Sequence, residues 1–186
     1  MSAPLPISRR LLAPGLFAAA ALPRPAAAAP ADGGLSRLRE EFRPLPAFSF
    51  LDGQGRSLTV EDFPGQGLLV NLWATWCPPC VAEMPALDRA QAILAAEGVA
   101  VLPLSSDRGG AEVVRAFYGR VGIRHLPLLL DPRGAAQRAL GVRGLPTTVL
   151  IDRSRREVAR LEGEAAWDQP PMLAALRRLI GPAGQG

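Results

Sequence analysis

Two kinds of apolar run follow one another along the chain, and together they predict a mixed α/β fold. Continuous apolar runs are typical of strands buried on both faces of a sheet, and they predict strands at 67–73, 99–105 and 126–131. Apolar residues recurring at the helical period predict helices at 77–96, 111–121, 135–140 and 168–180. Strands alternating with helices predict a mixed sheet with helices on both faces.

The pattern also predicts two hairpins, one before the first of these strands and one after the last. Residues Ala47–Val60 predict two short strands around a glycine-rich turn at Asp52–Gly55. Residues 146–152 and 156–163 predict an antiparallel hairpin that turns at 153–155.

These elements predict a single domain over residues 47–181. Residues 32–46 precede it and are polar at their start, so we expect a tether or a short helix there. Residues 182–186 form a short tail. In the last helix, Asp168 is expected to be the N-cap, with Pro170 and Pro171 in the first turn.

Residues 1–31 have the organisation of an export signal. Arg9 and Arg10 precede an apolar run at Leu11–Leu22, and small residues then offer cleavage after Ala28 or Ala31. The apolar run is too short to cross a bilayer core of about 30 Å comfortably. We therefore expect a periplasmic protein, exported by the general or the twin-arginine route, with an uncleaved membrane anchor as the alternative.

The basic residues do not indicate a nucleic-acid partner. All 21 are arginine and the net charge is +4, but Arg9, Arg10 and Arg24 lie in the leader, which has no acid. The rest of the chain is close to neutral and has no basic stripe with interleaved aromatic residues. We expect no nucleic-acid binding.

Candidate chemistry is concentrated in the segment NLWATWCPPCVAEMP, which holds the only two cysteines, Cys77 and Cys80. A disulfide that closes so short a loop stabilises the folded state only weakly, by about 2 kcal/mol in the loop-entropy model. A metal site would need two further ligands, and the one histidine, His125, has no ligand spacing around it. Covalent haem attachment needs a histidine where Val81 stands. A redox dithiol at a strand–helix junction fits the setting best.

The spacing explains how such a pair would work. Cys77 would cap the helix, where free N–H groups and the helix dipole favour a thiolate, and Cys80 would lie one turn further in. Pro78 and Pro79 suit the first helical positions but remove two N–H donors. We expect weaker thiolate stabilisation, a lower reduction potential and a better reductant.

These residues carry a family resemblance. The segments WATWCPPCVAEMPALD, GLPTTVLID and FSFLDGQGRSLTVEDFPGQ resemble the TlpA/ResA/CcmG group of exported, thioredoxin-like thiol:disulfide reductases. The resemblance covers 47–181. It implies an α/β, thioredoxin-like fold with a mixed central sheet flanked by helices, an N-terminal β-hairpin and a central insertion between Val99 and Leu130.

The resemblance also implies roles for the reacting residues. Cys77 would be the exposed nucleophile and Cys80 the resolving thiol. Thioredoxin has an acid on the strand where this chain has Asn71, and the resemblance places the active-site acid at Glu83 instead. Glu83 would accept the Cys80 proton. The alternative is a solvated acid that favours the helix dipole.

Four further residues are implied as the substrate-binding surface. Pro146 would be a cis proline, Leu145 would present its backbone to a client strand, and Thr147 follows in the same motif. Trp76 would shield the dithiol. Trp167, before the last helix, is expected only to pack.

The resemblance implies a reductase of client disulfides, and we expect it to be a monomer that uses no cofactor and no metal. Its clients would be apocytochrome c haem-site cysteines or copper-site assembly proteins, and a DsbD- or CcdA-type membrane protein would supply electrons. A net disulfide oxidase or isomerase is the first alternative. A copper metallochaperone is less favoured, because copper chaperones of similar fold carry a wider cysteine spacing and a dedicated histidine.

Overall fold

Strand β4 (Gly67–Trp73) lies at the centre of a mixed sheet, in a computed structural model that describes residues 32–182. The expected export signal at 1–31 and most of the expected tail lie outside the described residues. The sheet has eight strands in the order β1-β8-β7-β4-β5-β6-β2-β3. The other strands are β1 (Arg39–Pro44), β2 (Phe50–Asp52), β3 (Ser57–Leu58), β5 (Val99–Ser105), β6 (Leu129–Leu130), β7 (Thr147–Ile151) and β8 (Arg156–Glu162).

Every residue of β4 is buried, as its continuous apolar run predicts. It pairs in parallel with β5 and antiparallel with β7. The expected N-terminal hairpin is present as β2 and β3, and the expected C-terminal hairpin as β7 and β8.

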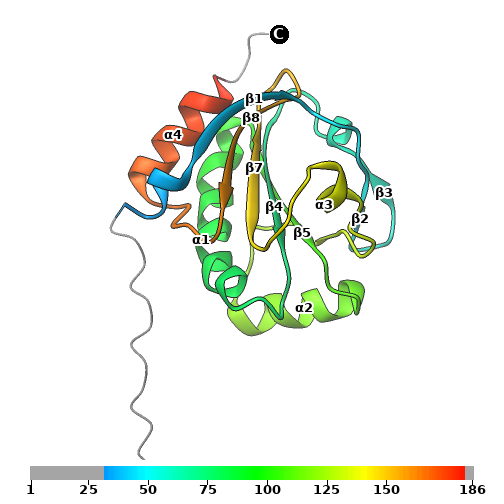
Figure 1. Ribbon diagram of the computed structural model, residues 1–186. Coiled ribbons are helices and arrows are strands. Elements are labelled where there is room, and N and C mark those ends of the chain that lie inside the picture. Colours follow the sequence, from blue (N-terminus) through cyan, green and yellow to red (C-terminus); the bar gives the residue numbers. More distant parts are fainter. Residues whose placement is uncertain (1–31, 183–186) are drawn as a thin grey trace, which may run out of the picture.

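Helices cover both faces of this sheet, which confirms the expected layered fold (Figure 1). The helices are α1 (Pro78–Leu94), α2 (Gly110–Val121), α3 (Ala135–Ala139) and α4 (Pro170–Ile180), with 3-10 turns η1 (Leu35–Arg37), η2 (Val60–Asp62) and η3 (Ala95–Glu97). One core cluster joins α1, α2 and α4 to Leu69 and Trp73 of β4. A second cluster joins α3 and β2 to the alternate β4 residues Leu68, Val70 and Leu72.

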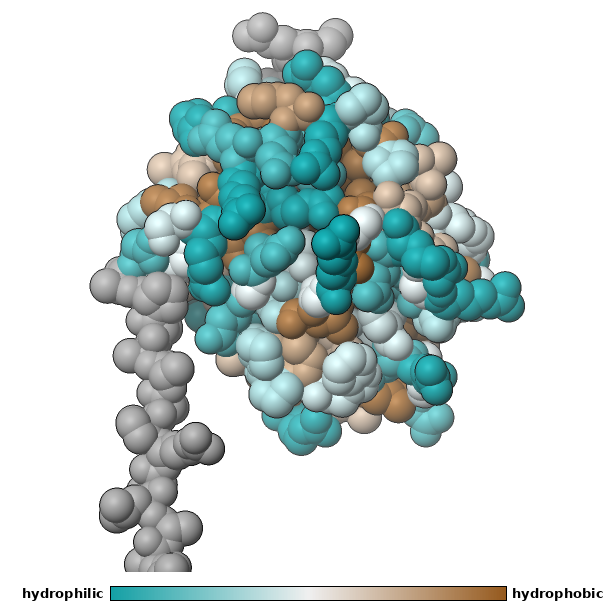
Figure 2. All heavy atoms as spheres, viewed as in Figure 1, coloured by the Kyte–Doolittle hydropathy of each residue, from teal (hydrophilic) through white to brown (hydrophobic). Residues whose placement is uncertain are grey.

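The segment at 32–46 is not a tether: it begins with the short 3-10 helix η1 and continues as a strand that was not expected. After η1, strand β1 pairs antiparallel with β8 and forms one edge of the sheet. Nearly all of its side chains are exposed, including Phe42. Hydrophilic side chains dominate the molecular surface in the region of β1 (Figure 2). With no buried face, β1 lacks the alternating pattern by which strands are recognised.

Two expected details of the helices are also corrected. The N-cap of α4 is Gln169, and the Asp168 carboxylate instead accepts a hydrogen bond from Arg89 Nε of α1 at 2.7 Å. In α2, the helical spacing predicts an apolar side made of Val113, Val114, Phe117 and Tyr118, but Val113 is 39% exposed while the other three are buried. Pro170 and Pro171 do occupy the first turn of α4.

Strand β6 is shorter than its apolar run predicts, and Asp88 of α1 binds the chain where this run begins. Its Oδ1 accepts the backbone N–H groups of Arg124, His125 and Leu126, at 3.1, 2.7 and 3.0 Å. The first residue of the run, Leu126, is therefore tied to α1 together with the two residues before it, and not to β5. No helix within residues 32–182 combines the length and hydropathy needed to cross a membrane.

Candidate active site

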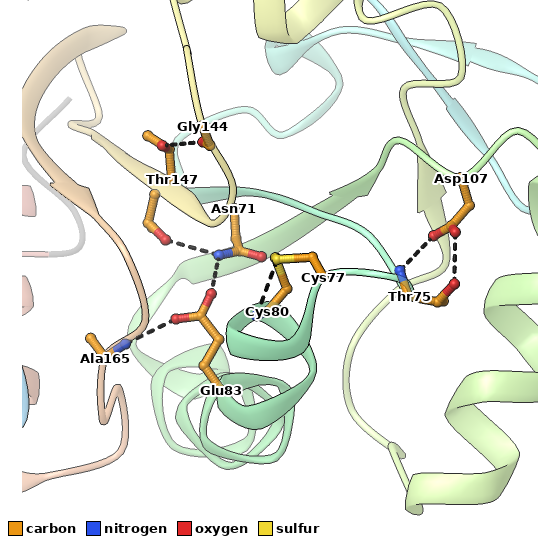
Figure 3. Close-up of a disulfide and its surroundings, with 10 residues drawn as sticks. Asn71, Thr75, Cys77, Cys80, Glu83, Asp107, Gly144, Thr147 and Ala165 are labelled. Carbon is orange, nitrogen blue, oxygen red and sulfur yellow. Dashed lines mark hydrogen bonds between the residues drawn. A yellow bond between two sulfur atoms is a disulfide. The ribbon is translucent and has the colours of Figure 1, made fainter. Parts of the chain in front are cut away.

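Cys77 and Cys80 form a disulfide at the junction between β4 and α1 (Figure 3). Cys77 is the N-cap of α1, as expected, and its Sγ accepts the Cys80 N–H at 3.4 Å. The Cα atoms are 5.3 Å apart. Cys77 is only 5% exposed and Cys80 is fully buried, so the expected exposed nucleophile is nearly buried in the disulfide state. Cys77 is still the more accessible of the two cysteines.

Asp107, which follows β5, holds the loop that leads to Cys77. Its carboxylate accepts the Thr75 amide at 2.9 Å and the Thr75 hydroxyl at 2.7 Å, and the Ser105 hydroxyl donates to it at 2.7 Å. These contacts join two parallel strands at their carboxyl ends. The sequence offered no signal for this anchor, because Thr75 and Asp107 are 32 residues apart.

Glu83 lies one turn after Cys80 on α1 and is only 3% exposed. Its Oε1 accepts a hydrogen bond from Asn71 Nδ2 at 2.8 Å. Its Oε2 accepts the Ala165 N–H at 3.0 Å and the Trp167 indole N–H at 2.8 Å. Glu83 is therefore not a solvated acid at a helix start.

Burial raises the pKa of Glu83 from 4.5 to about 7, against the lowering effect of the hydrogen bonds from Trp167, Asn71 and Ala165. A carboxyl that titrates near neutral pH can both accept and return a proton. Glu83 also lines a cavity of about 410 Å³ together with Ala86 and Glu164, which connects this buried group to the surface.

Trp167 is the residue that sequence reasoning missed. It is fully buried, as a packing residue would be, but its indole N–H also donates to the buried acid. Thr148 of β7 was missed as well, and its Oγ1 accepts a hydrogen bond from Asn71 Nδ2 at 2.9 Å. Trp167 stands far from the cysteines in the sequence and in no quoted motif. Thr148 lies within the segment GLPTTVLID, but that motif gives no sign of its contact with Asn71.

The Leu145–Pro146 peptide bond is cis, as the resemblance implies. Pro146 is buried, and its carbonyl accepts the Gly163 N–H at 2.8 Å. Thr147 begins β7 opposite Leu72 of β4, and its hydroxyl donates to the Gly144 carbonyl at 2.8 Å. The pairing with β4 places this loop at the same end of the sheet as the disulfide.

Leu145 is half-buried at this edge, whereas Trp76 is 67% exposed. Pro78 and Pro79 are also exposed. The indole of Trp76 thus projects toward solvent beside the nearly buried disulfide. The residues implied for catalysis and for client binding are therefore found at one end of the sheet.

Comparison with known proteins agrees with this geometry. The Redoxin family model matches residues 42–176. A thiol-disulfide oxidoreductase ResA of Bacillus thuringiensis subsp. konkukian is 31% identical over 124 residues, which cover 67% of this chain and 70% of that protein. The ResA of Geobacillus thermodenitrificans is 35% identical over 109 residues, which cover 59% of this chain and 62% of that protein.

A solved structure shows the same architecture. It is a Chlorobium tepidum protein assigned as a thiol:disulfide interchange protein DsbE, with a TM-score of 0.63 and 27% identity. The similarity covers 76% of this chain and 96% of that one. The fold is therefore thioredoxin-like, and the chain belongs to the Redoxin family, in its ResA/CcmG-like group of thiol:disulfide oxidoreductases.

Proposed function

We propose that this thiol:disulfide oxidoreductase acts as a reductase of client disulfides outside the cytoplasm, and that Cys77, Cys80 and Glu83 carry the reaction. The observation that supports it most directly is the buried Glu83 carboxyl, one turn after the resolving cysteine, with its pKa raised to about 7 by burial. A base of that pKa suits removal of a thiol proton near neutral pH.

The first step uses the slight exposure of Cys77. Its thiolate attacks one sulfur of the client disulfide, so a mixed disulfide forms and the other client sulfur leaves as a thiolate. The half-buried Leu145, held between Gly144 and the cis Pro146, presents its backbone to the client strand, and Thr147 supports this loop through its bond to Gly144. The exposed indole of Trp76 packs against the client.

The second step uses Cys80. Glu83 accepts the Cys80 proton, and the resulting thiolate attacks Cys77 Sγ of the mixed disulfide. The Cys77–Cys80 disulfide forms and the client leaves with both of its sulfurs reduced. Two electrons pass from the protein dithiol to the client, and Glu83 returns its proton to solvent through the adjoining cavity.

The helix start supports net reduction rather than oxidation. Pro78 and Pro79 have no N–H groups, so among the described residues the Cys77 sulfur accepts the N–H of Cys80, at 3.4 Å, and none from the two residues between them. A thiolate with few donors is less stabilised, which lowers the reduction potential. A DsbD- or CcdA-type membrane protein would then re-reduce the pair, and apocytochrome c or copper-site assembly proteins would be clients of a monomeric, periplasmic enzyme.

The role of Glu83 is tested by Glu83→Gln, with Glu112→Gln on the exposed face of α2 as a charge-matched control. Loss of a positioned base should slow client release from the mixed disulfide by about 10²-fold, and the Cys77–client intermediate should accumulate. The control should react like the wild type. Equal release rates for wild type and Glu83→Gln would rule out Glu83 as the base.

The direction of electron flow is tested by the reduction potential, measured in equilibrium with glutathione. The reduction potential of a reductase should be more negative than about −200 mV, whereas a potential near −120 mV would indicate an oxidase. Pro78→Ser restores one N–H in the first turn and should raise the potential. A potential that stays equal or falls would contradict this account of the prolines.

A further inference from the structure

The amide of Asn71 is paired on one side only. Its Nδ2 donates to Glu83 Oε1 at 2.8 Å and to Thr148 Oγ1 at 2.9 Å. Its Oδ1 is buried and has no hydrogen-bond partner among the residues that the structure describes. Buried acceptors are nearly always paired, so an unpaired one at the centre of a reactive site needs an explanation.

The orientation of this amide is set by its neighbours. If the amide were rotated by half a turn, Oδ1 would face the Glu83 carboxylate, and two acceptors would meet without a hydrogen between them. The two bonds from Nδ2 therefore hold Oδ1 on the opposite side. In the site, Asn71 Oδ1 points toward the disulfide (Figure 3).

The alternation of β4 independently places Asn71 on the disulfide side of the sheet. Leu69 and Trp73, two residues before and after it, belong to the same core cluster as Cys77 and Cys80. Since side chains two apart on a strand share a face, Asn71 faces α1 as they do. Its contact with Glu83, one turn beyond Cys80, confirms that it meets this part of the helix.

A disulfide sulfur carries no hydrogen and cannot donate to Oδ1. Reduction breaks the S–S bond and adds two electrons and two protons, one to each sulfur. Because Cys80 is fully buried, water does not reach its new S–H group, and this weak donor can pair only with an acceptor inside the protein. We propose that Asn71 Oδ1 accepts the Cys80 thiol hydrogen in the reduced protein, which makes Asn71 a positioning residue that is unpaired in the disulfide state and paired in the dithiol state.

This hydrogen bond favours the dithiol over the disulfide, because only the dithiol satisfies Oδ1. It therefore raises the reduction potential, in opposition to the effect expected of Pro78 and Pro79. It also holds the Cys80 proton beside Asn71, whose Nδ2 contacts the Glu83 carboxylate. The inference rests on thiol–disulfide chemistry alone and not on the client or the direction of electron flow.

The S–H stretching band of Cys80 gives a direct test. It is measured by infrared spectroscopy in the full chain carrying Cys77→Ala, in which Cys80 is the remaining thiol. The band should lie at the lowered frequency of a hydrogen-bonded thiol, and adding Asn71→Leu should move it to the free-thiol position. A band that Asn71→Leu leaves in place would overturn the proposal.

Matched variants identify the acceptor. Thr148→Val removes a partner of Asn71 Nδ2 but keeps Oδ1, so the band should remain at the lowered frequency. Glu83→Gln should also leave the band there. A band that moves with Glu83→Gln but not with Asn71→Leu would assign the thiol hydrogen to Glu83 and would overturn the proposal.

The reduction potential gives a second readout that a purely structural role would not produce. Asn71→Leu removes the unpaired acceptor from the disulfide state and the paired one from the dithiol state. The equilibrium constant for reduction by glutathione should fall about tenfold, which equals about 30 mV. The shift should persist in a Glu83→Gln background, where it cannot arise from the Glu83 charge. An unchanged or larger constant would overturn the proposal, and Asn71→Ala provides the same test if Asn71→Leu does not fold.

Discussion

The indole nitrogen of Trp167 lies 2.8 Å from Glu83 Oε2, across 84 residues of chain. Trp167 stands between β8 and α4, and Ala165 in the same segment donates its backbone N–H to the same oxygen. The acid of the candidate active site therefore depends on a segment far from the cysteines. This segment supplies two donors that favour the ionised carboxylate, whereas burial disfavours it.

Replacement of Trp167 should change the pH at which Glu83 works. Trp167→Phe keeps most of the buried ring but removes the N–H that stabilises the carboxylate, so the pKa of Glu83 should rise above its value of about 7. The release of client from the mixed disulfide, followed in single turnovers, should then reach half of its maximal rate about one pH unit higher.

Trp73 offers a matched control for this experiment. It is also fully buried, but its indole nitrogen has no hydrogen-bond partner among residues 32–182. Trp73→Phe therefore removes a similar volume without removing a donor to Glu83. A pH profile that shifts equally in both variants would show that the indole N–H of Trp167 does not act on the acid.

The raised pKa of Glu83 also predicts how the stability of the oxidised protein depends on pH. Since the pKa is about 7 in the folded state and 4.5 in the unfolded state, the folded state binds more protons between these values. The contribution of Glu83 to the stability of the folded state should be fully present below pH 4.5. The free energy of unfolding should then fall by about 3 kcal/mol as the pH rises to 7. Above that pH, the contribution of Glu83 stays constant.

Urea unfolding of the oxidised wild type and of Glu83→Gln, at pH 5 and pH 8, isolates this effect. The disulfide keeps both cysteines from titrating. Glutamine does not ionise, so the fall in unfolding free energy should be smaller in the variant by about 3 kcal/mol. An equal fall in both proteins would mean that Glu83 is ionised as readily in the folded state as in the unfolded one.

Trp76 should matter for client binding and little for stability. Because its side chain is 67% exposed, Trp76→Ala should change the free energy of unfolding by less than about 0.5 kcal/mol. The KM for a disulfide-containing client peptide should rise about tenfold, the loss typical of an aromatic anchor. Phe42→Ala, on β1, removes an equally exposed aromatic ring and should leave KM unchanged. A KM that responds to both substitutions alike would refute a specific role for Trp76.

Asp88 should be important for stability rather than for chemistry. Its Oδ1 accepts three backbone N–H groups from residues 124–126, so Asp88→Ala leaves these donors without their partner. We expect a loss of about 2–4 kcal/mol in urea unfolding. Asp88→Asn keeps a carbonyl oxygen in that place and should lose less. Equal losses would show that the charge, and not the acceptor geometry, stabilises this loop.

Local patterns in the sequence determined most of the fold and the position of the redox pair. The apolar run of β4, the glycine that ends the helical region at Gly98 and the hairpin turn at Asp52–Gly55 act within a few residues, so they can be recognised without a structure. The placement of Cys77 as the N-cap of α1 follows from the same local rules.

Tertiary structure alone decided the environment of the reactive groups. Whether Glu83 is solvated or buried depends on Trp167 and Ala165, which approach it from beyond β8. The edge strand β1 formed because β8 offers it backbone partners, although its own residues bury little surface. Short-range propensities set the elements, but pKa values and hydrogen-bond pairing depend on groups distant in sequence, and these meet only when the chain has packed.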